Sequence, residues 1–326
     1  MTKPHALTTI EQPQPQGCRN ILNVFGGPKL PPPTTGQQVV LADGRKLGYA
    51  EFGDPDGKPV FFFHGMPGSR LFRHPDDSIA ASLGVRLIVV DRPGIGLSDL
   101  KPKRKLIEWP DDVVGLADAL QIDRFAVAGV SAGGPHTMAC AYKIPHRLSG
   151  VALVSAAAPH RAPGVMEGMN PQIKTSFQTV GCGCLPWWSL LPAMTIYART
   201  GRNNPEKLWQ RMIDGSPPPD QALLREPEVK AVFLDSLRET YRQGPNGHIF
   251  DALAIARDWG FHVKDITAPV QLWQGLADPQ VPPAMGRYLA ATIPTCEPHY
   301  IPDEGHLMMF KADIWRDILA GLVGEM

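Results

Sequence analysis

Residues 129–133 read Gly-Val-Ser-Ala-Gly, which matches the pattern G-x-S-x-G. A buried-strand pattern over 124–130 precedes the serine, and a helical pattern over 133–142 follows it. Small neighbours allow the sharp turn from strand to helix, and a helix N-terminus favours negative charge that develops beside the hydroxyl. The motif in this context predicts that Ser131 is a nucleophile. The alternative is a helix-capping serine in a turn of small residues.

A serine hydroxyl becomes a nucleophile when a neighbouring base, usually histidine, takes its proton. Of ten histidines, His306 follows Gly305 in a predicted loop between the last strand and the last helix. Parallel sheets present such loops at their carboxyl edge, so His306 is the predicted base; the alternative is a solvent-facing loop residue. His64 competes but precedes a glycine-rich loop, where we interpret it as structural. His136 lies within the helical pattern and is expected to pack or to face solvent.

The base needs a carboxylate that fixes its tautomer and stabilises its charged form. Asp278 directly follows the predicted buried strand 269–274, and the chain order Ser, Asp, His is one that such triads use. A second place for the acid, after the strand 148–155, holds only Ala-Ala-Ala-Pro. Asp278 is therefore the predicted acid. Asp303 is the fallback, and a turn-capping role is the alternative for Asp278.

Acyl transfer also needs donors that stabilise an oxyanion. Residues 64–68 (His-Gly-Met-Pro-Gly) follow the apolar run 59–63, and we expect the main-chain N–H groups of Met66 and Ala132 to be these donors. The side chain of Met66 is also expected to line the acyl pocket. The glycine-rich segment 91–96 lacks the ending of a P-loop and the full G-x-G-x-x-G spacing, so it is interpreted as a structural loop.

Alternating strand and helix patterns must position these residues. This alternation predicts an α/β fold with a doubly wound, mostly parallel sheet. The predicted strands are 38–41, 46–52, 59–63, 85–90, 124–130, 148–155, 269–274 and 298–301, and the predicted helices between or after them are 77–83, 109–120, 133–142, 283–291 and 307–322.

The alternation stops over residues 159–262, which read as helices and loops. We therefore expect an irregular N-terminal arm (1–36), a core (37–158 and 263–326) and an inserted helical lid (159–262). Apolar lid residues are candidates for an acyl or ring pocket, with packing on the core or a homodimer contact as the alternative. These residues are Trp187, Trp188, Leu190, Leu191 and Met194.

The composition of the chain limits the kinds of partner that it is expected to bind. Lys+Arg and Asp+Glu both number 32, so no basic excess favours nucleic acid, and a small-molecule substrate is expected. Residues 1–20 show no secretory signal, and prolines interrupt the most apolar window, 184–198, so no stable membrane span is expected. Five scattered cysteines favour a cytoplasmic setting, and Cys182 and Cys184 are interpreted as ordinary thiols rather than a metal or redox pair. No cofactor or metal is expected.

Residues 38–326 resemble the α/β-hydrolase fold family in five ordered motifs. The motifs are 64–68, 91–94, 129–133, 275–278 with Val281-Pro282, and Gly305-His306. The resemblance implies a Ser-His-Asp site under a helical lid, without specifying a substrate. Ser131 stands where epoxide hydrolases and haloalkane dehalogenases carry aspartate. Ala132 and Met66 depart from proline iminopeptidases, which usually have tryptophan and glycine there.

The sequence thus favours a serine hydrolase that cleaves a small, largely apolar carboxylic ester through an acyl-Ser131 intermediate. The same site could instead serve a carbon–carbon bond hydrolase, a lactonase or a cyclase. A non-catalytic ligand-binding receptor of the same fold is a third alternative. It is less favoured, because receptors derived from enzymes often lose a triad member, and here none is missing.

Overall fold

The computed structural model describes residues 33–183 and 186–324. Its centre is a single eight-stranded sheet. The strand order is β1-β2-β4-β3-β5-β6-β7-β8; β2 is antiparallel to both β1 and β4, and all other pairs are parallel. The predicted α/β fold with a mostly parallel sheet is therefore confirmed. The strands are β1 (Thr34–Val40), β2 (Lys46–Gly53), β3 (Lys58–Phe63), β4 (Val85–Val90), β5 (Phe125–Val130), β6 (Leu148–Val154), β7 (Val270–Gly275) and β8 (Cys296–Ile301).

The central strands are buried on both faces, which explains their continuous apolar runs. In β3, Phe61 and Phe63 pack into one layer, whereas Val60 and Phe62 pack into the opposite layer. Every residue of β5 is buried. Helices that cross back between parallel strands supply both covering layers.

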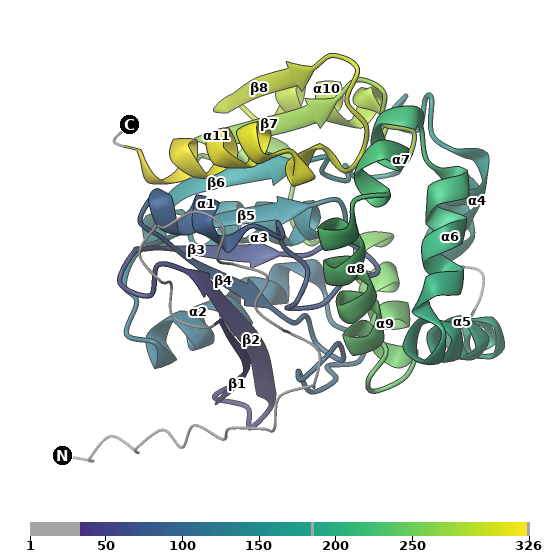
Figure 1. Cartoon of the computed structure of the whole chain (residues 1–326), viewed down its shortest axis with the longest axis horizontal. Coiled ribbons are helices and arrows are strands. Elements are labelled where there is room, and N and C mark those ends of the chain that lie inside the picture. Colours follow the sequence, from purple (N-terminus) through teal and green to yellow (C-terminus); the bar gives the residue numbers. More distant parts are fainter. Residues whose placement is uncertain (1–32, 184–185, 325–326) are drawn as a thin grey trace.

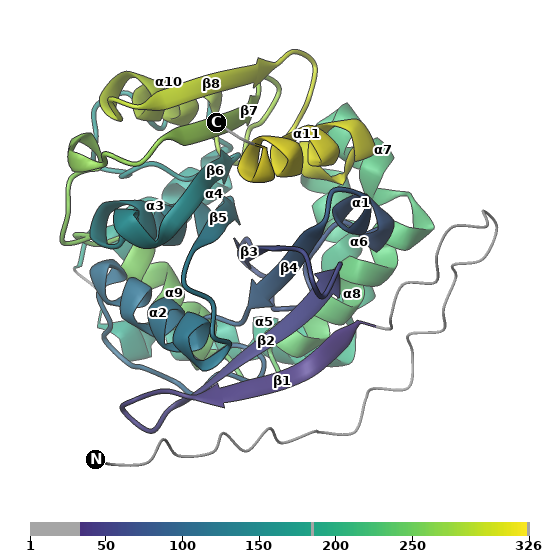
Figure 2. The ribbon, with the colours of Figure 1, turned by 90° about the vertical axis from the view of Figure 1, so that its left-hand side faces the viewer.

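Helices cover both faces of the sheet (Figure 2). α2 (Trp109–Ala119), α3 (Gly133–Lys143) and α10 (Pro283–Thr292) pack on one face, and α1 (Asp77–Ser82) and α11 (Ala312–Val323) pack on the other. Because the layers bury the sheet, polar loops at the carboxyl ends of the strands are left for chemistry.

Between β6 and β7 the chain forms a helical insertion, drawn in green at the right of Figure 1. Its helices are α4 (Pro171–Gly181), α5 (Leu191–Asn203), α6 (Pro205–Gly215), α7 (Pro218–Leu224), α8 (Pro227–Thr240) and α9 (Asn246–Ile255), with a 3₁₀ turn at Trp187–Leu190. α6 to α8 bury apolar side chains in the layer that holds α1 and α11, and the end of α9 joins the opposite layer. The insertion is thus anchored on both layers.

The predicted arm, 1–36, extends too far into the chain. β1 begins at Thr34, which pairs with Glu51 of β2; residues 1–32 lie outside the described residues. The sequence of β1 (Thr-Thr-Gly-Gln-Gln-Val-Val) is polar at its start, because a strand at the sheet edge needs little apolar burial. The strand predicted from the sequence therefore began only at residue 38.

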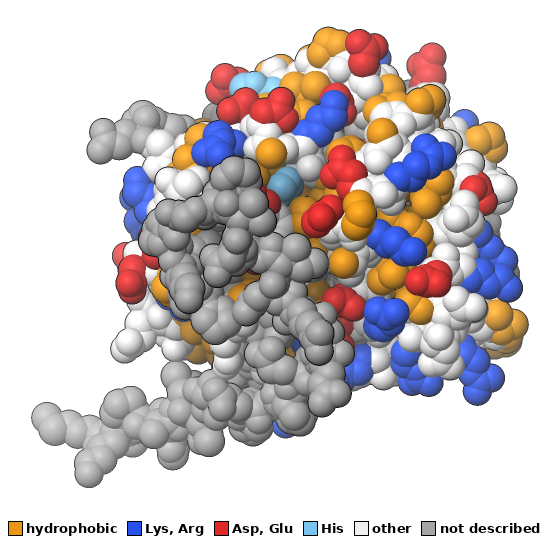
Figure 3. Space-filling view, viewed as in Figure 1, with side chains coloured by type: hydrophobic (Ala, Val, Ile, Leu, Met, Phe, Trp, Pro, Cys, Tyr) orange, Lys and Arg blue, Asp and Glu red, His pale blue; other side chains and the backbone are white. Residues whose placement is uncertain are grey.

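The surface shown in Figure 3 mixes acidic and basic side chains without one dominant charged patch, apart from the area covered by grey residues. This mixture agrees with the formal net charge of zero. Among the described residues, no helix has the length and apolar character needed to span a bilayer.

Candidate active site

Ser131 occupies the turn between β5 and α3, with a left-handed backbone (φ 55°) that is strained for a residue with a Cβ. Two glycines permit the turn. A Cβ on Gly133 would lie 2.0 Å from the carbonyl oxygen of Phe63, and one on Gly129 would lie 2.2 Å from Oγ1 of Thr137. The structure therefore explains both glycines of the G-x-S-x-G motif. It sets Ser131 half-buried at the N-terminal end of α3.

His306 and Asp278 are hydrogen-bonded to each other. Nδ1 of His306 lies 2.7 Å from Oδ2 of Asp278, and both side chains are buried. The other oxygen, Oδ1, accepts hydrogen bonds from the main-chain N–H groups of Gln280 and Val281 (2.8 and 2.9 Å). These bonds hold the carboxylate in place. Because Asp278 binds Nδ1, the other ring nitrogen of His306, Nε2, remains available to accept a proton.

Asp303, the fallback acid, lies exposed in the turn after β8 and makes no hydrogen bond to His306 among the described residues. Its backbone is left-handed (φ 59°), as expected for a turn residue. The structure therefore pairs the histidine with Asp278 rather than with Asp303.

Burial alone would lower the pKa of the His306 imidazole, because it disfavours the charged form. The charge of Asp278 and its hydrogen bond, with a further contribution from the charge of Asp220, outweigh burial and raise the pKa above the usual 6.5. An imidazole with this bias readily takes a proton from a neighbouring hydroxyl.

The last residue of β6 and the segment after it connect Ser131 with His306. Val154 accepts a hydrogen bond from the N–H of Ser131 (3.0 Å), and Ala157 donates one to its carbonyl oxygen (3.1 Å). Between them, Oγ of Ser155 donates to the carbonyl oxygen of His306 (3.2 Å). Within the described residues, Oγ of Ser131 and the His306 imidazole are not hydrogen-bonded. In ligand-free enzymes such bonds are often long and tighten when substrate binds.

The loop that carries Met66 lies beside Ser131: a Cβ on Gly65 would be 3.9 Å from Oγ of the serine. The guanidinium of Arg92 donates to the carbonyl oxygens of His64 and Gly65, the latter at 3.1 Å. In a trans peptide, a carbonyl oxygen held on one side directs the following N–H to the other side. In the described part of the chain, the N–H groups of Met66 and Ala132 have no acceptor. Both N–H groups therefore remain available as hydrogen-bond donors.

A buried ionic cluster that was not predicted from the sequence holds Arg92 in place against this loop. Asp251 of α9 binds Arg92 (2.8 Å) and Arg104, and Nε2 of His136 lies 3.4 Å away. All four side chains are buried. Burial would raise the pKa of Asp251, but Arg92, His136 and Arg104 hold it well below the usual range. His136 is thus a buried polar partner, because its helical spacing directs it to α9 rather than to solvent.

His64 is buried, with Nδ1 2.8 Å from the carbonyl oxygen of Gly65. Burial, reinforced by the positive charge of Arg92, holds its pKa well below 6.5, so the ring is neutral. This placement agrees with the interpretation of His64 as a structural residue of its loop.

Asp220 is a second residue that the sequence analysis missed. Its carboxylate, in the first turn of α7, accepts hydrogen bonds from the main-chain N–H groups of His306 and Leu307, both at 2.9 Å. The residue lies in a Pro-Pro-Pro-Asp run without a recognisable motif, so nothing in the sequence connected it with His306.

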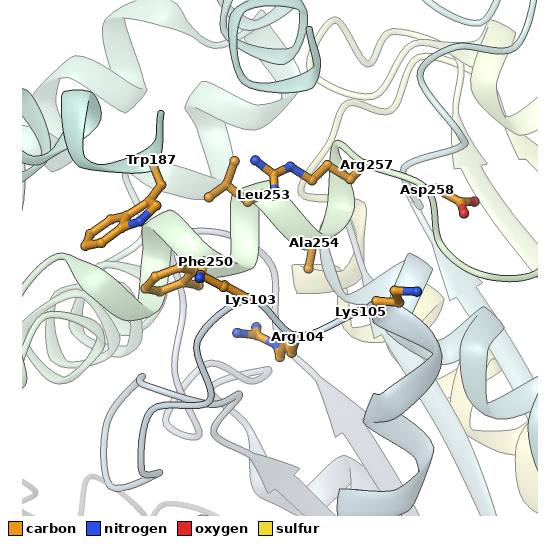
Figure 4. Close-up of a pocket in the computed structure, with 9 residues that line it drawn as sticks. All are labelled: Lys103, Arg104, Lys105, Trp187, Phe250, Leu253, Ala254, Arg257 and Asp258. Carbon is orange, nitrogen blue, oxygen red and sulfur yellow. The ribbon is translucent and has the colours of Figure 1, made fainter. Parts of the chain in front are cut away.

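Most of the predicted pocket residues of the insertion gather around α9. Trp187, Leu190, Leu191 and Met194 pack against Ile249, Phe250 and Leu253, with the Trp187 and Phe250 rings 5.2 Å apart. Trp188 is 61% exposed and does not join this cluster. Beside the two rings lies a cavity of about 330 Å³ whose walls include Lys103, Arg104 and Arg257 (Figure 4). Neither Ser131 nor His306 lines it.

No group of three or more metal-ligating side chains occurs among residues 33–183 and 186–324. Cys182 is exposed, and Cys184 lies outside the described residues.

Comparisons with known proteins add the family. A model of the alpha/beta hydrolase family matches residues 60–317. The chain is 33% identical over 144 residues to the dihydrolipoyllysine-residue acetyltransferase component of an acetoin cleaving system from Pseudomonas putida, covering 43% of this chain and 36% of that protein. It is 35% identical over 133 residues to the 2-hydroxy-6-oxo-6-phenylhexa-2,4-dienoate hydrolase of Comamonas testosteroni, covering 37% and 45%. The chain thus spans less than half the length of these curated relatives.

Among solved structures, the enol-lactonase from Burkholderia xenovorans LB400 superposes with a TM-score of 0.64 at 21% identity, covering 88% of this chain and all of that one. This likeness supports the fold alone. Because the family model covers most of the sequence, the resemblance inferred from the motifs is confirmed, and this chain belongs to the alpha/beta hydrolase family.

Proposed function

We propose that this protein hydrolyses a small, largely apolar carboxylic ester through an acyl-Ser131 intermediate. The observation that carries the proposal is the buried 2.7 Å hydrogen bond between His306 and Asp278, in a site where Ser131 occupies a strained strand-to-helix turn. A nucleophile, an oriented base and free oxyanion donors are the parts that acyl transfer requires.

In the first half of the reaction, Nε2 of His306 takes the proton of the Ser131 hydroxyl as Oγ attacks the ester carbonyl carbon. The carbonyl oxygen becomes an oxyanion that accepts hydrogen bonds from the N–H groups of Met66 and Ala132. Collapse breaks the bond to the leaving alkoxide oxygen, which receives the proton from His306. An alcohol departs, and the acyl group stays on Ser131.

In the second half, water attacks the acyl carbon and transfers a proton to His306. Collapse of this second tetrahedral intermediate breaks the ester bond to Ser131 and returns the proton to Oγ. Asp278 stabilises the imidazolium in both halves without taking its proton. The products are one carboxylic acid and one alcohol, and no cofactor enters the balance.

The insertion would cover this site as a lid. The hydrogen bonds that Asp220 of α7 accepts from the main chain at His306 and Leu307 support this role. The cluster around Trp187, Leu191 and Met194 is the candidate for an apolar pocket wall, and the cavity beside it would have to open towards Ser131 to receive the acyl group. Trp188 is exposed and would contribute only after a rearrangement of the insertion.

Carbon–carbon bond cleavage is the second candidate, favoured by the likeness to the dienoate hydrolase of Comamonas testosteroni. Ester and diketone substrates would use the same serine and histidine, so product analysis must separate the two reactions.

A fluorophosphonate probe followed by a substrate screen tests the proposal. We expect the parent protein, but not Ser131→Ala, to be labelled at residue 131. We also expect turnover of p-nitrophenyl esters that depends on acyl length and exceeds turnover of lactones and diketones. A folded parent that is never labelled would refute the nucleophile, and faster diketone cleavage would favour the second candidate.

A further inference from the structure

The insertion touches the loop of the candidate base directly, through Asp220. Both carboxylate oxygens are engaged: Oδ2 accepts from the N–H of His306, and Oδ1 accepts from the N–H of Leu307, each at 2.9 Å. Asp220 is fully buried, and a buried charge persists only where such partners satisfy it. An acceptor for two successive N–H groups defines the position and the tilt of that stretch of backbone.

The contact is closely fitted. A Cβ on Gly305 would lie 2.4 Å from Oδ1 and 2.5 Å from Oδ2 of Asp220, so only glycine allows the carboxylate to come this near. This fit explains why glycine precedes the histidine in the Gly305-His306 motif.

α7 itself is firmly placed. Leu223 and Leu224, which follow Asp220 on the helix, are buried in the layer that also contains Phe310 of the loop after His306. The ring of Phe233, from the next helix, packs 5.3 Å from the ring of Phe310. Apolar packing therefore fixes both sides of the hydrogen-bonded contact.

We propose that Asp220 is a positioning residue for His306: from the insertion it sets the orientation of the base relative to Ser131. The inference rests on the proposed function of the Ser131 site. Within the core, Ser155 holds the carbonyl oxygen of His306 and Asp278 holds Nδ1. Asp220 supplies a third restraint, on the main-chain N–H, and within residues 33–183 and 186–324 it is the only hydrogen bond to His306 that comes from the insertion.

Asp220 also acts on the imidazole through its charge. The charged groups that influence the pKa of His306 are Asp278, from the loop after β7, and Asp220, from α7. Glu304, in the loop that carries His306, is paired with Lys311. Both carboxylates favour the imidazolium. Removing the charge of Asp220 therefore lowers the pKa of His306, an effect that a purely structural contact would not have.

Asp220→Asn tests the proposal, because the amide keeps the shape but loses the charge and presents a donor to one N–H. We expect kcat to fall about ten- to a hundredfold, the effect of losing a hydrogen bond to a charged group, while KM changes less than about twofold. The acid limb of the kcat/KM profile should move to lower pH. Asp214→Asn, which removes an exposed carboxylate from neighbouring α6, should behave as the parent.

An NMR titration of the His306 imidazole provides a readout that needs no turnover. Supporting results are a lower pKa in Asp220→Asn than in the parent and an unchanged pKa in Asp214→Asn. Equal pKa values and equal kcat in Asp220→Asn and the parent would overturn the proposal, as would an equal loss in both variants. If the parent showed neither esterase activity nor labelling at Ser131, the proposed function would fail, while the titration would still decide the role of Asp220.

Gly305→Ala probes the same contact from the other side if Asp220→Asn does not fold. Its methyl group would push the carboxylate away while leaving the charge in the protein. We expect a fall in kcat of the same order, with a smaller shift of the acid limb. A Gly305→Ala protein with the parent's kcat would contradict the proposal, because the contact would then be dispensable.

Discussion

Nδ1 of His306 and Oδ2 of Asp278 lie 2.7 Å apart although the two residues stand on different loops of the sheet edge. Because this bond orients the imidazole, Asp278→Asn should reduce kcat by about 10⁴-fold, through the wrong tautomer and the loss of the charge. Asp303→Asn, which changes an exposed neighbour, serves as the control and should keep the parent's rate. The measurement is steady-state hydrolysis of the best p-nitrophenyl ester. The opposite ranking would move the acid role to Asp303.

The pH profile should reveal His306 as the base. Burial opposes protonation, but Asp278 and Asp220 outweigh it, so the pKa lies above 6.5. The imidazole must be neutral to take the proton of Ser131, and it becomes protonated as pH falls through this pKa. We therefore expect kcat/KM to fall on the acid side with a midpoint above 6.5. A midpoint below 6.5 would show that the carboxylates do not stabilise the imidazolium as inferred.

The ionic cluster around Asp251 should matter for stability. Asp251→Asn leaves Arg92 and Arg104 buried without their common carboxylate, and breaking a buried pair typically costs about 3–5 kcal/mol of unfolding free energy. Denaturant unfolding of the variant against the parent measures this loss. Asp258→Asn, an exposed substitution just after α9, should change the unfolding free energy by less than about 0.5 kcal/mol. Equal stability of the two variants would mean that the cluster is not a net anchor.

Chelation should leave the rate unchanged, because the proposed chemistry takes its nucleophile from Ser131 and its charge stabilisation from main-chain N–H groups. Hydrolysis is measured before and after prolonged treatment with EDTA, followed by removal of the chelator. An activity that disappears and then returns when a divalent metal is added would require a mechanism other than the proposed one.

Much of the core followed from local patterns. Residues 60–63 and the residues of β5 form continuous apolar runs. Such runs predict central parallel strands, because both faces of these strands are covered. The turn at Ser131 was also predictable. The sharp turn requires small residues at fixed positions around the serine, so it leaves a recognisable spacing in the sequence.

Edge and insertion features were less visible. The first residues of β1 are polar because an edge strand buries little, so the predicted arm overlapped the first three residues of the strand. Trp188 and Trp187 are adjacent and equally apolar, yet only Trp187 packs against Phe250. Which of two neighbouring aromatic residues is buried depends on the partner surface rather than on composition.

The sequence by itself determined the fold class, the strand-to-helix turn at Ser131 and the selection of His306 and Asp278 as partners. Only the tertiary structure decided that Asp220 holds the His306 backbone and that Asp251 joins Arg92 to Arg104. The physical reason is that these contacts link residues between 86 and 159 positions apart. Buried carboxylates accept hydrogen bonds from the N–H groups that packing brings near them, and the spacing of residues in the sequence does not predict which groups these are.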